Sequence, residues 1–347
     1  MVDLVVRGAG VIGLACAWTA LRRGARVAIT EPRGVASGAS GGVVGALSPH
    51  APERWTPAKA LQLRALVAAR GFWPEVEDAS GISTGYARAG RLQPLVDEAA
   101  VRRARDRAEG ALRHWGTAAT WEVVSAPEGW GPASATGLVL RDTLAAHLHP
   151  RRACSALAAA IRAAGGTIGP EAAPAGAPVI EATGWEGLRE HDLGAGQKGQ
   201  GALLGFDARG EPQIYTGGIH VIPHLDGTTG IGSTSEGEWT DAAPDAAVDA
   251  VIARARVAVP ALADAPVIER WGAIRPRART REPVIGRLPS GAVIANGGFK
   301  IGFGIAPEVA RLAVDLALEG RDDVPDGMRP GPAAPLPPDP HRGSVRP

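Results

Sequence analysis

Residues 1–32 read MVDLVVRGAGVIGLACAWTALRRGARVAITEP, and the order of segments in this stretch decides the fold that follows. Leu4–Val6 is a short, branched apolar run, typical of a buried strand, and a glycine-rich turn ends it. Residues 14–23 are rich in alanine, leucine and arginine, which predicts a helix that ends at Gly24. Residues 26–30 predict a second strand. Strand, glycine turn, helix and strand make one βαβ unit, so we expect its two strands to be parallel.

Three glycines in the turn and one acid after the second strand point to a dinucleotide. Gly8 allows the tight turn, Gly10 lets the backbone approach a pyrophosphate, and Gly13 permits close packing of helix on strand. The helix N-terminus offers free N–H groups and a positive dipole end to phosphates. Glu31 follows about 20 residues later, where a carboxylate can accept hydrogen bonds from a ribose diol. This acid favours NAD or FAD over NADP.

Composition limits the classes of protein to which the chain can belong. Its 347 residues suffice for one or two domains, and a net charge of +1 gives no electrostatic case for nucleic acid or an anionic membrane. The two cysteines, Cys16 and Cys154, form neither a disulfide framework nor a metal set, so we expect two small core residues. The chain begins in a strand without a signal peptide, and no apolar run approaches the roughly 18 residues that span a bilayer. We expect a cytoplasmic protein without a membrane span or a metal, and oligomerisation stays open.

Parallel and antiparallel signals alternate along the rest of the chain. Ala36–Gly45 is a loop of small residues that suits a close approach to a ligand, or a linker. Helical patterns cover residues 57–77, 96–115, 150–164, 245–257 and 305–318. Strand patterns cover residues 86–94, 179–184, 267–274 and 292–296, and short pieces in 201–235 predict an antiparallel sheet.

These signals predict an α/β protein in which a doubly wound dinucleotide-binding domain is interleaved with a mixed or antiparallel-sheet substrate domain. We expect the dinucleotide domain to comprise residues 1–80, 137–186 and 286–322, and the substrate domain residues 81–136 and 187–285. The proline-rich stretch 323–347 is expected to be a disordered tail.

Six motifs, in order over residues 4–319, resemble those of the FAD-dependent D-amino acid oxidase family, most closely its glycine oxidase branch. They are GAGVIG (8–13) with Glu31, ASGASGGVVGAL (36–47), EATGW (181–185), KGQ (198–200), WGAIRP (271–276) and GGFKIGFGIAP (297–307). The resemblance implies FAD, and a Rossmann-like domain to hold it. It also implies oxidation of an amino acid by hydride transfer from Cα to flavin N5, followed by hydrolysis to a keto acid and ammonia. The implied cofactor-binding residues are Gly8, Gly10, Val11, Ile12, Gly13, Glu31, Pro32, Ala36, Ser37, Gly41, Gly42, Val43, Thr183, Gly184, Gly297, Gly298, Phe299, Lys300, Ile301, Gly302 and Phe303.

The resemblance also implies a substrate site. Arg275 matches the arginine that holds the substrate carboxylate, a task that suits a guanidinium because it grips a carboxylate with two hydrogen bonds. His220 stands where the family often has a tyrosine, with Tyr215 nearby, and histidine charge can vary near neutral pH. This departure puts glycine in doubt as substrate, and leaves an imino acid, a larger D-amino acid or a sarcosine-like amine. Lys300 replaces an arginine and can bring positive charge to the substrate or the flavin. The helix after Gly302 would direct its N-terminus at the flavin pyrimidine.

Several other interpretations remain. Oxygen is the expected acceptor, with hydrogen peroxide as product, but a dehydrogenase that reduces a quinone or a partner protein fits the same motifs, and so does a non-catalytic dinucleotide-binding subunit. An NAD-dependent dehydrogenase explains only the N-terminal motif. The His147/His149 and His220/His224 pairs lack other ligands, and residues four apart on a strand are about 13 Å apart, so we interpret them as structural. His50 follows the small-residue loop and is a weaker candidate for the site.

Overall fold

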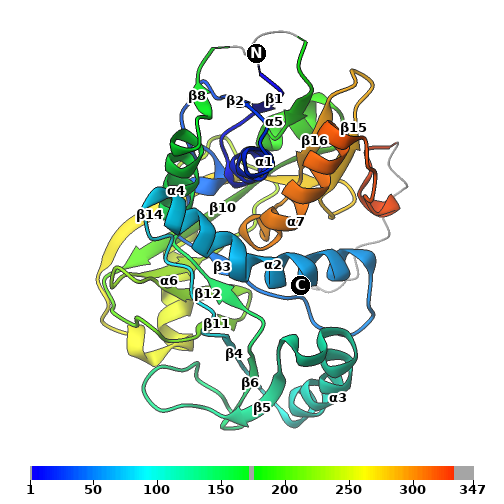
Figure 1. Ribbon diagram of the computed structural model, residues 1–347. Helices are drawn as coiled ribbons and strands as arrows, with labels where there is room; N and C mark the ends of the chain where they lie inside the picture. Colours follow the sequence, from blue (N-terminus) through cyan, green and yellow to red (C-terminus); the bar gives the residue numbers. More distant parts are fainter. Residues whose placement is uncertain (1, 172–175, 332–347) are drawn as a thin grey trace.

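The computed structural model describes residues 2–171 and 176–331. Two sheets dominate this part of the chain, one above the other in Figure 1, with helix α2 (Pro57–Ser80) crossing between them. The α/β fold class with parallel and antiparallel sheets is therefore confirmed.

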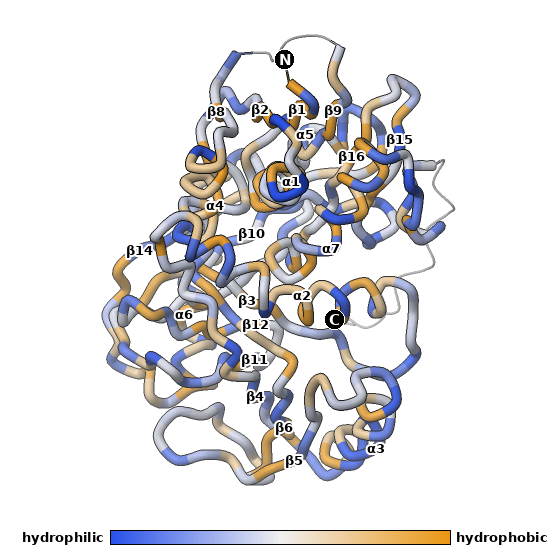
Figure 2. Tube along the Cα trace, in the orientation of Figure 1, coloured by the Kyte–Doolittle hydropathy of each residue, from blue (hydrophilic) through white to orange (hydrophobic). Residues whose placement is uncertain are grey.

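The upper sheet in Figure 1 has the strand order β15-β16-β9-β1-β2-β8 in the described residues. Its pairings are parallel except for the antiparallel pair β15/β16, and β1 lies between β2 and β9, as the opening βαβ unit requires. Figure 2 shows hydrophobic residues along β1, β9 and β16. The strands are β1 (Leu4–Arg7), β2 (Val27–Thr30), β8 (Thr167–Gly169), β9 (Val179–Glu181), β15 (Val284–Arg287) and β16 (Val293–Asn296).

Helices rich in alanine and leucine pack with this sheet and form the largest core. Helix α1 packs on α7 and α4, and α2 packs on the same two helices. The buried residues of α1 include Cys16, and those of α4 include Cys154, so both free thiols are small core residues as predicted. Burial raises the pKa of each thiol to about 12. The helices are α1 (Val11–Arg22), α4 (Pro150–Ala163), α5 (Gly184–Glu190) and α7 (Gly302–Val314).

The lower sheet is mixed, with the order β14-β10-β13-β12-β11-β4-β6-β5 in the described residues. All its pairings are antiparallel except β11/β4. The strands are β4 (Arg91–Pro94), β5 (Trp121–Ser125), β6 (Leu138–Asp142), β10 (Gly194–Leu204), β11 (Gln213–Thr216), β12 (Ile219–Pro223), β13 (Thr229–Gly232) and β14 (Val267–Ala278). Helix α6 (Ala247–Ala258) packs on β10, and α3 (Glu98–Trp115) packs on β5.

The long antiparallel pair β10/β14 sets the register of the site. It places Gly199 opposite Ala273 and Gln197 opposite Arg275. A separate two-stranded ribbon, β3 (Ala46–Leu47) with β7 (Ala146–His147), holds the end of the small-residue loop.

The structure differs from the sequence-based expectations at several places; for example, strands β5, β8 and β15 were not predicted. Strand β6 pairs with β4 and β5 in the lower sheet, so it does not belong with the dinucleotide-binding segment 137–186. Helix α5 follows directly on β9 and was not predicted, and α7 begins at Gly302 rather than near residue 305. The first part of the predicted tail is ordered, because Val324 and Met328 are buried hydrophobic anchors. Residues 332–347, the rest of that predicted tail, lie outside the described residues.

Candidate functional site

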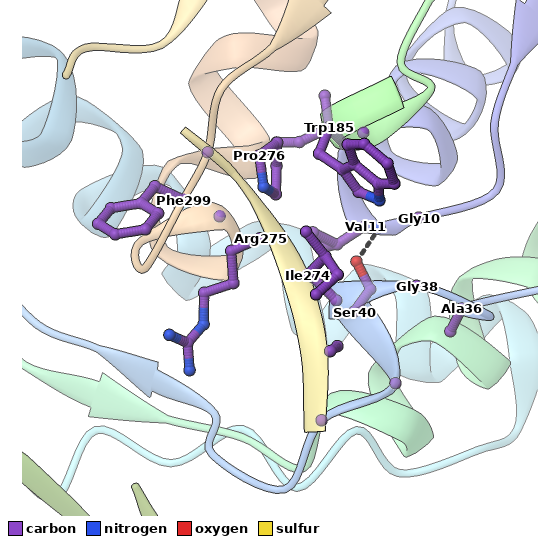
Figure 3. Close-up of a pocket in the computed structure, with 18 of the residues that line it drawn as sticks. Gly10, Val11, Ala36, Gly38, Ser40, Trp185, Ile274, Arg275, Pro276 and Phe299 are labelled. Carbon is purple, nitrogen blue, oxygen red and sulfur yellow. Dashed lines mark hydrogen bonds between the residues drawn. The ribbon is translucent and has the colours of Figure 1, made fainter. Parts of the chain in front are cut away.

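A cavity of about 850 Å³ is lined by residues of both sheets. The upper side supplies the glycine turn after β1, the loop after β2 and the start of α7, and the lower side supplies β11, β12 and Trp271–Pro276 of β14. Figure 3 shows Arg275 extending from β14, with Val11 and Ser40 on the far side of that strand. The edge of an open α/β sheet that carries the carboxyl ends of its strands is where such folds bind ligands.

The glycine turn lets the backbone pack where side chains would collide. A Cβ on Gly8, whose φ is +101°, would lie 2.4 Å from the carbonyl oxygen of Ala182. A Cβ on Gly13 would lie 2.0 Å from the carbonyl oxygen of Gly8. Gly10 lines the cavity at the start of α1, where the first N–H groups of a helix have no partner within the helix. Ser40 Oγ accepts from Val11 N–H and Glu31 accepts from Ala9 N–H, so the donors of the helix start that remain for the cavity begin with the N–H of Ile12.

The small-residue loop after β2 lies against this turn. Ser40 Oγ accepts a hydrogen bond from the N–H of Val11 at 3.0 Å (Figure 3), and Ala36 N–H donates to the carbonyl of Ala9 at 3.0 Å. A Cβ on Gly42 would come within 3.1 Å of the Trp271 ring. The absence of a side chain at Gly42 therefore lets the loop approach the lower sheet. The loop therefore forms a wall of the cavity rather than a free linker.

Glu31 is fixed at one end of the cavity by main-chain donors. Its two carboxylate oxygens accept hydrogen bonds from Ala9 N–H at 3.1 Å and from Arg33 N–H at 2.9 Å. The Arg33 guanidinium makes a two-armed ion pair with Glu186 of α5, at 2.8 and 2.6 Å. Glu31, Arg33 and Glu186 all line the cavity. The carboxylates of Glu31 and Glu186 are therefore held in place as hydrogen-bond acceptors at this end.

Arg275 supplies a buried cation at the other end. The residue is 8% exposed, and burial lowers the pKa of its guanidinium to about 10. Its Nη1 donates to the carbonyl of Thr234 at 3.1 Å, and no carboxylate of the described residues forms an ion pair with it. A Cβ on Gly199 would lie 1.9 Å from Arg275 Cζ, so the guanidinium lies directly over this glycine. Its remaining donors suit an anionic ligand.

A buried polar network holds the segment to which Arg275 binds. Gln200 N–H donates to Thr234 Oγ1 at 2.8 Å, and Thr234 N–H donates to the Gln200 carbonyl at 3.1 Å. The Gln200 side chain donates to Glu236 at 3.0 Å and to Asp245 at 2.8 Å. Lys198 Nζ donates to Asp245 at 2.7 Å. The KGQ motif therefore acts on the site through the Thr234 carbonyl.

Tyr215 and His220 line the cavity from opposite positions of the β11/β12 hairpin. Their ring centroids are 4.6 Å apart. Burial, with the positive charges of Arg91, Lys300 and Arg275, lowers the pKa of His220 to about 3. The expectation of a histidine that titrates near neutral pH is therefore wrong: the imidazole is neutral. Its buried Nδ1 has no hydrogen-bond partner among the described residues.

Lys300 stands at the solvent-accessible edge of the same end. Its Nζ lies 5.6 Å from the centre of the Phe299 ring, and Arg277 Cζ lies at the same distance from that ring. Partial burial and the charges of Arg275 and Arg277 lower the pKa of Lys300 to about 8. This part of the cavity therefore carries crowded positive charge.

Most of the predicted site residues come together in this cavity. Those that line it are Gly8, Gly10, Val11, Ile12, Glu31, Pro32, Ala36, Ser37, Gly41, Gly42, Thr183, Gly184, Tyr215, His220, Arg275, Gly298, Phe299, Lys300, Gly302 and Phe303. Gly13, Val43, Gly297 and Ile301 do not line it. Gly13 packs behind the turn, and Val43 is buried behind the loop.

Sequence reasoning missed several lining or supporting residues. Ser40 belongs to the predicted loop, and its hydroxyl in a run of glycines was the signal. Trp185 and Trp271 were quoted within motifs but not assigned to the site, although both line the cavity. Gly199 could not be found without the register of β10 and β14, because its importance comes from the Arg275 side chain, which reaches over it from the neighbouring strand.

The other histidines lie outside the cavity lining. The structure brings His149 and His224 together, with ring centroids 4.5 Å apart, a pairing that neither sequence pair predicted. Burial lowers the pKa of His147 to about 4 and, with neighbouring charges, that of His224 to about 3. In the described ranges, no group of three or more His, Cys, Asp or Glu is arranged to hold a metal ion. His50 is not part of the cavity lining. No helix of those ranges is long and apolar enough to cross a membrane.

Comparisons with known proteins agree on one family. Residues 3–316 match the family model described as FAD dependent oxidoreductase (DAO). A glycine oxidase from Bacillus licheniformis is 25% identical over 354 residues, covering 91% of this chain and 93% of the relative. The crystal structure of glycine oxidase from Geobacillus kaustophilus has a TM-score of 0.80 at 21% identity, covering 92% of this chain and 95% of that one. Iminodiacetate oxidase from Chelativorans sp. BNC1 has a TM-score of 0.83 at 22% identity, covering 95% and 100%.

Proposed function

Because the chain belongs to the DAO family of FAD-dependent oxidoreductases, we propose that it oxidises the amine of a small amino acid held by its carboxylate at Arg275. The observation that carries this proposal is the buried guanidinium in the cavity, which has one main-chain acceptor and no carboxylate of its own among the described residues. The charge of Glu236 acts on the buried Arg275 guanidinium without forming an ion pair with it, so an anionic ligand is still favoured there. Two parallel hydrogen bonds would fix that ligand's orientation.

The residues present fit FAD. The N–H groups at the start of α1 suit its pyrophosphate, and Glu31 suits the diol of the adenosine ribose. The glycines of the turn and loop leave room that side chains would fill. Gly302 and Phe303 bring the N-terminal end of α7 to the cavity, where its positive dipole end suits the flavin pyrimidine. When bound, FAD would accept the hydride, which carries two electrons, that leaves the substrate's Cα.

The chain's own residues act by binding and orientation. Arg275 sets the direction of Cα through the adjoining carboxylate, and the Thr234 carbonyl limits the freedom of the guanidinium. Neutral His220, next to Tyr215, can donate or accept a hydrogen bond without adding charge. The resulting imino acid would hydrolyse to a keto acid and ammonia. The domain division is likewise a proposal: residues 1–80, 137–186 and 286–322 for the cofactor domain, with β6 pairing in the lower sheet, and residues 81–136 and 187–285 for the substrate domain.

The test is anaerobic mixing of the purified yellow protein with a panel of D-, L- and N-methyl amino acids. We expect at least one to abolish the visible flavin absorbance, and admission of air to restore it with formation of hydrogen peroxide. Restoration by a quinone but not by air would favour the dehydrogenase alternative. If no amino acid of the panel lowers the flavin absorbance, the result would favour a non-catalytic flavin-binding subunit.

The substitution Glu31→Ala is expected to weaken FAD binding roughly tenfold or more, because a charged acceptor of hydrogen bonds is worth about 1.5 kcal/mol or more. Titration of the apoprotein with FAD, followed by quenching of flavin fluorescence, measures the dissociation constant. Glu109→Ala, which removes an exposed acid from α3, is the matched control. Equal affinity of the two variants would remove Glu31 from the cofactor site.

A further inference from the structure

The two ends of the cavity differ in charge. The acids that line it, Glu31 and Glu186, lie at the end where main-chain donors and Arg33 already hold them. The other end is lined by two cations, Arg275 and Lys300, and by no acid within the described residues. One carboxylate at Arg275 would leave the charge of Lys300 unmatched.

Lys300 differs from the other two lysines of the chain in having no polar partner. Lys59 donates to main-chain carbonyls, including that of Ala51 at 2.7 Å, and Lys198 is paired with Asp245. For the Lys300 ammonium, the described residues supply no hydrogen bond and no ion pair, only the face of the Phe299 ring. Phe299 has a φ of +41°, a conformation that a non-glycine residue adopts only when its surroundings hold it there. The loop is thus held in a shape that presents Lys300 at the cavity edge.

The position of Lys300 relates it to the substrate rather than to solvent alone. After burial, the charge of Arg275 contributes to the lowered pKa of Lys300, and the charge of Lys300 contributes to that of His220. Arg275 and His220 come from different strands of the lower sheet, and both line the cavity with Lys300. Arg275 is buried, whereas Lys300 is solvent-accessible. A ligand held by one carboxylate at Arg275 would therefore extend its free end toward Lys300.

We propose that Lys300 binds a second carboxylate, so that the preferred substrate is a dicarboxylic amino acid with a primary or secondary amine. This inference rests on the proposed function, because it assigns the α-carboxylate to Arg275. It makes Lys300 a residue that determines specificity: the distal carboxylate neutralises a charge that a monocarboxylic amino acid leaves unpaired.

The test uses two non-oxidisable probes of equal chain length, succinate and butyrate, bound to the FAD-loaded protein. Binding is measured by perturbation of the flavin absorbance and by titration calorimetry. We expect succinate to bind roughly tenfold or more tightly than butyrate, Lys300→Met to abolish that difference, and Lys300→Arg to retain it. Arg105→Met, which removes an exposed charge from α3, is the control and should leave both affinities unchanged. Malonate and glutarate then measure the preferred spacing.

Three results would overturn the inference: equal binding of both probes to the unmodified protein, an equal loss for both in Lys300→Met, or loss of FAD from that variant. The last would assign Lys300 to the cofactor. Anaerobic reduction by aspartate and asparagine separates the two proposals. If both amino acids reduce the flavin equally well, the proposed oxidation stands and the second-carboxylate site fails. If no amino acid reduces it, the proposed oxidation itself fails.

Discussion

Arg275→Met is expected to lower kcat/KM for the amino acid substrate by roughly 30- to 5,000-fold, with most of the change in KM. The substitution removes the donors that would grip the substrate carboxylate. Truncating one partner of a buried charge pair costs about 2–5 kcal/mol of binding, which corresponds to this range. Arg275→Lys should recover only part of the loss, because an ammonium is a point charge without the planar pair of donors.

The same variant should fold as well as the unmodified protein. Burial lowers the pKa of Arg275 to about 10, which means that its charge is held at a cost when no anion is bound. Methionine removes this charge and keeps an apolar side chain of similar length. We therefore expect an unchanged or higher Tm and full FAD content, a pattern that a general structural defect would not produce.

Steady-state kinetics, the flavin-to-protein ratio and thermal unfolding measure these three quantities on one preparation. Arg270→Met is the matched control, because it lies on the same strand, is exposed and pairs with Asp249 outside the cavity lining. An Arg275→Met enzyme with the KM of Arg270→Met would exclude the carboxylate-binding role. A loss of FAD in Arg275→Met alone would instead assign the arginine to the cofactor.

The parts of the fold that the sequence predicted are those with local signals. The strand, glycine turn, helix and strand of residues 4–30 follow from periodicity and turn chemistry, and α2 and α3 follow from the helical patterns of residues 57–77 and 96–115. The order of the lower sheet has no such signal, because β4 pairs with β6 on one side and with β11, about 120 residues later, on the other. For the same reason, no local signal in residues 138–142 indicates that β6 pairs with β4 and β5 in the lower sheet.

For the site, too, features with a local sequence signal were predicted and features that depend on distant residues were not. Motifs predicted which residues gather, and Tyr215 and His220 were expected close together because they share a hairpin. What the motifs could not predict was the state of His220, since its lowered pKa depends first on burial and then on cations from β4, β14 and the loop before α7. The role of Lys198 and Gln200 was also hidden. Their side chains do not line the cavity, and they act through Thr234, more than 30 residues later.

Gly199→Ala is expected to lower kcat/KM by roughly 100-fold, because a displacement of about 1 Å in a substrate-positioning group has an effect of this size. The new methyl group would lie 1.9 Å from Arg275 Cζ and 2.2 Å from its Nη2, so the guanidinium has to move. Its charge remains in the cavity, but it can no longer keep both its hydrogen bond to the Thr234 carbonyl and its direction toward a ligand.

The folding cost of this methyl group should be small, and that is what makes the variant informative. The atoms it meets are the far end of a flexible side chain, not backbone, so a change of Arg275 rotamer relieves the contact. We therefore expect Tm within about 2 °C of the unmodified protein, a shift that corresponds to about 1.5 kcal/mol for a chain of this size. Gly237→Ala is the control, since a Cβ there meets no atom within 4 Å.

In the double variant Gly199→Ala/Arg275→Met, the loss of kcat/KM should not exceed that of Arg275→Met alone, because both changes remove the same interaction. Additive losses would show that Gly199 acts on the reaction by a route other than the position of Arg275.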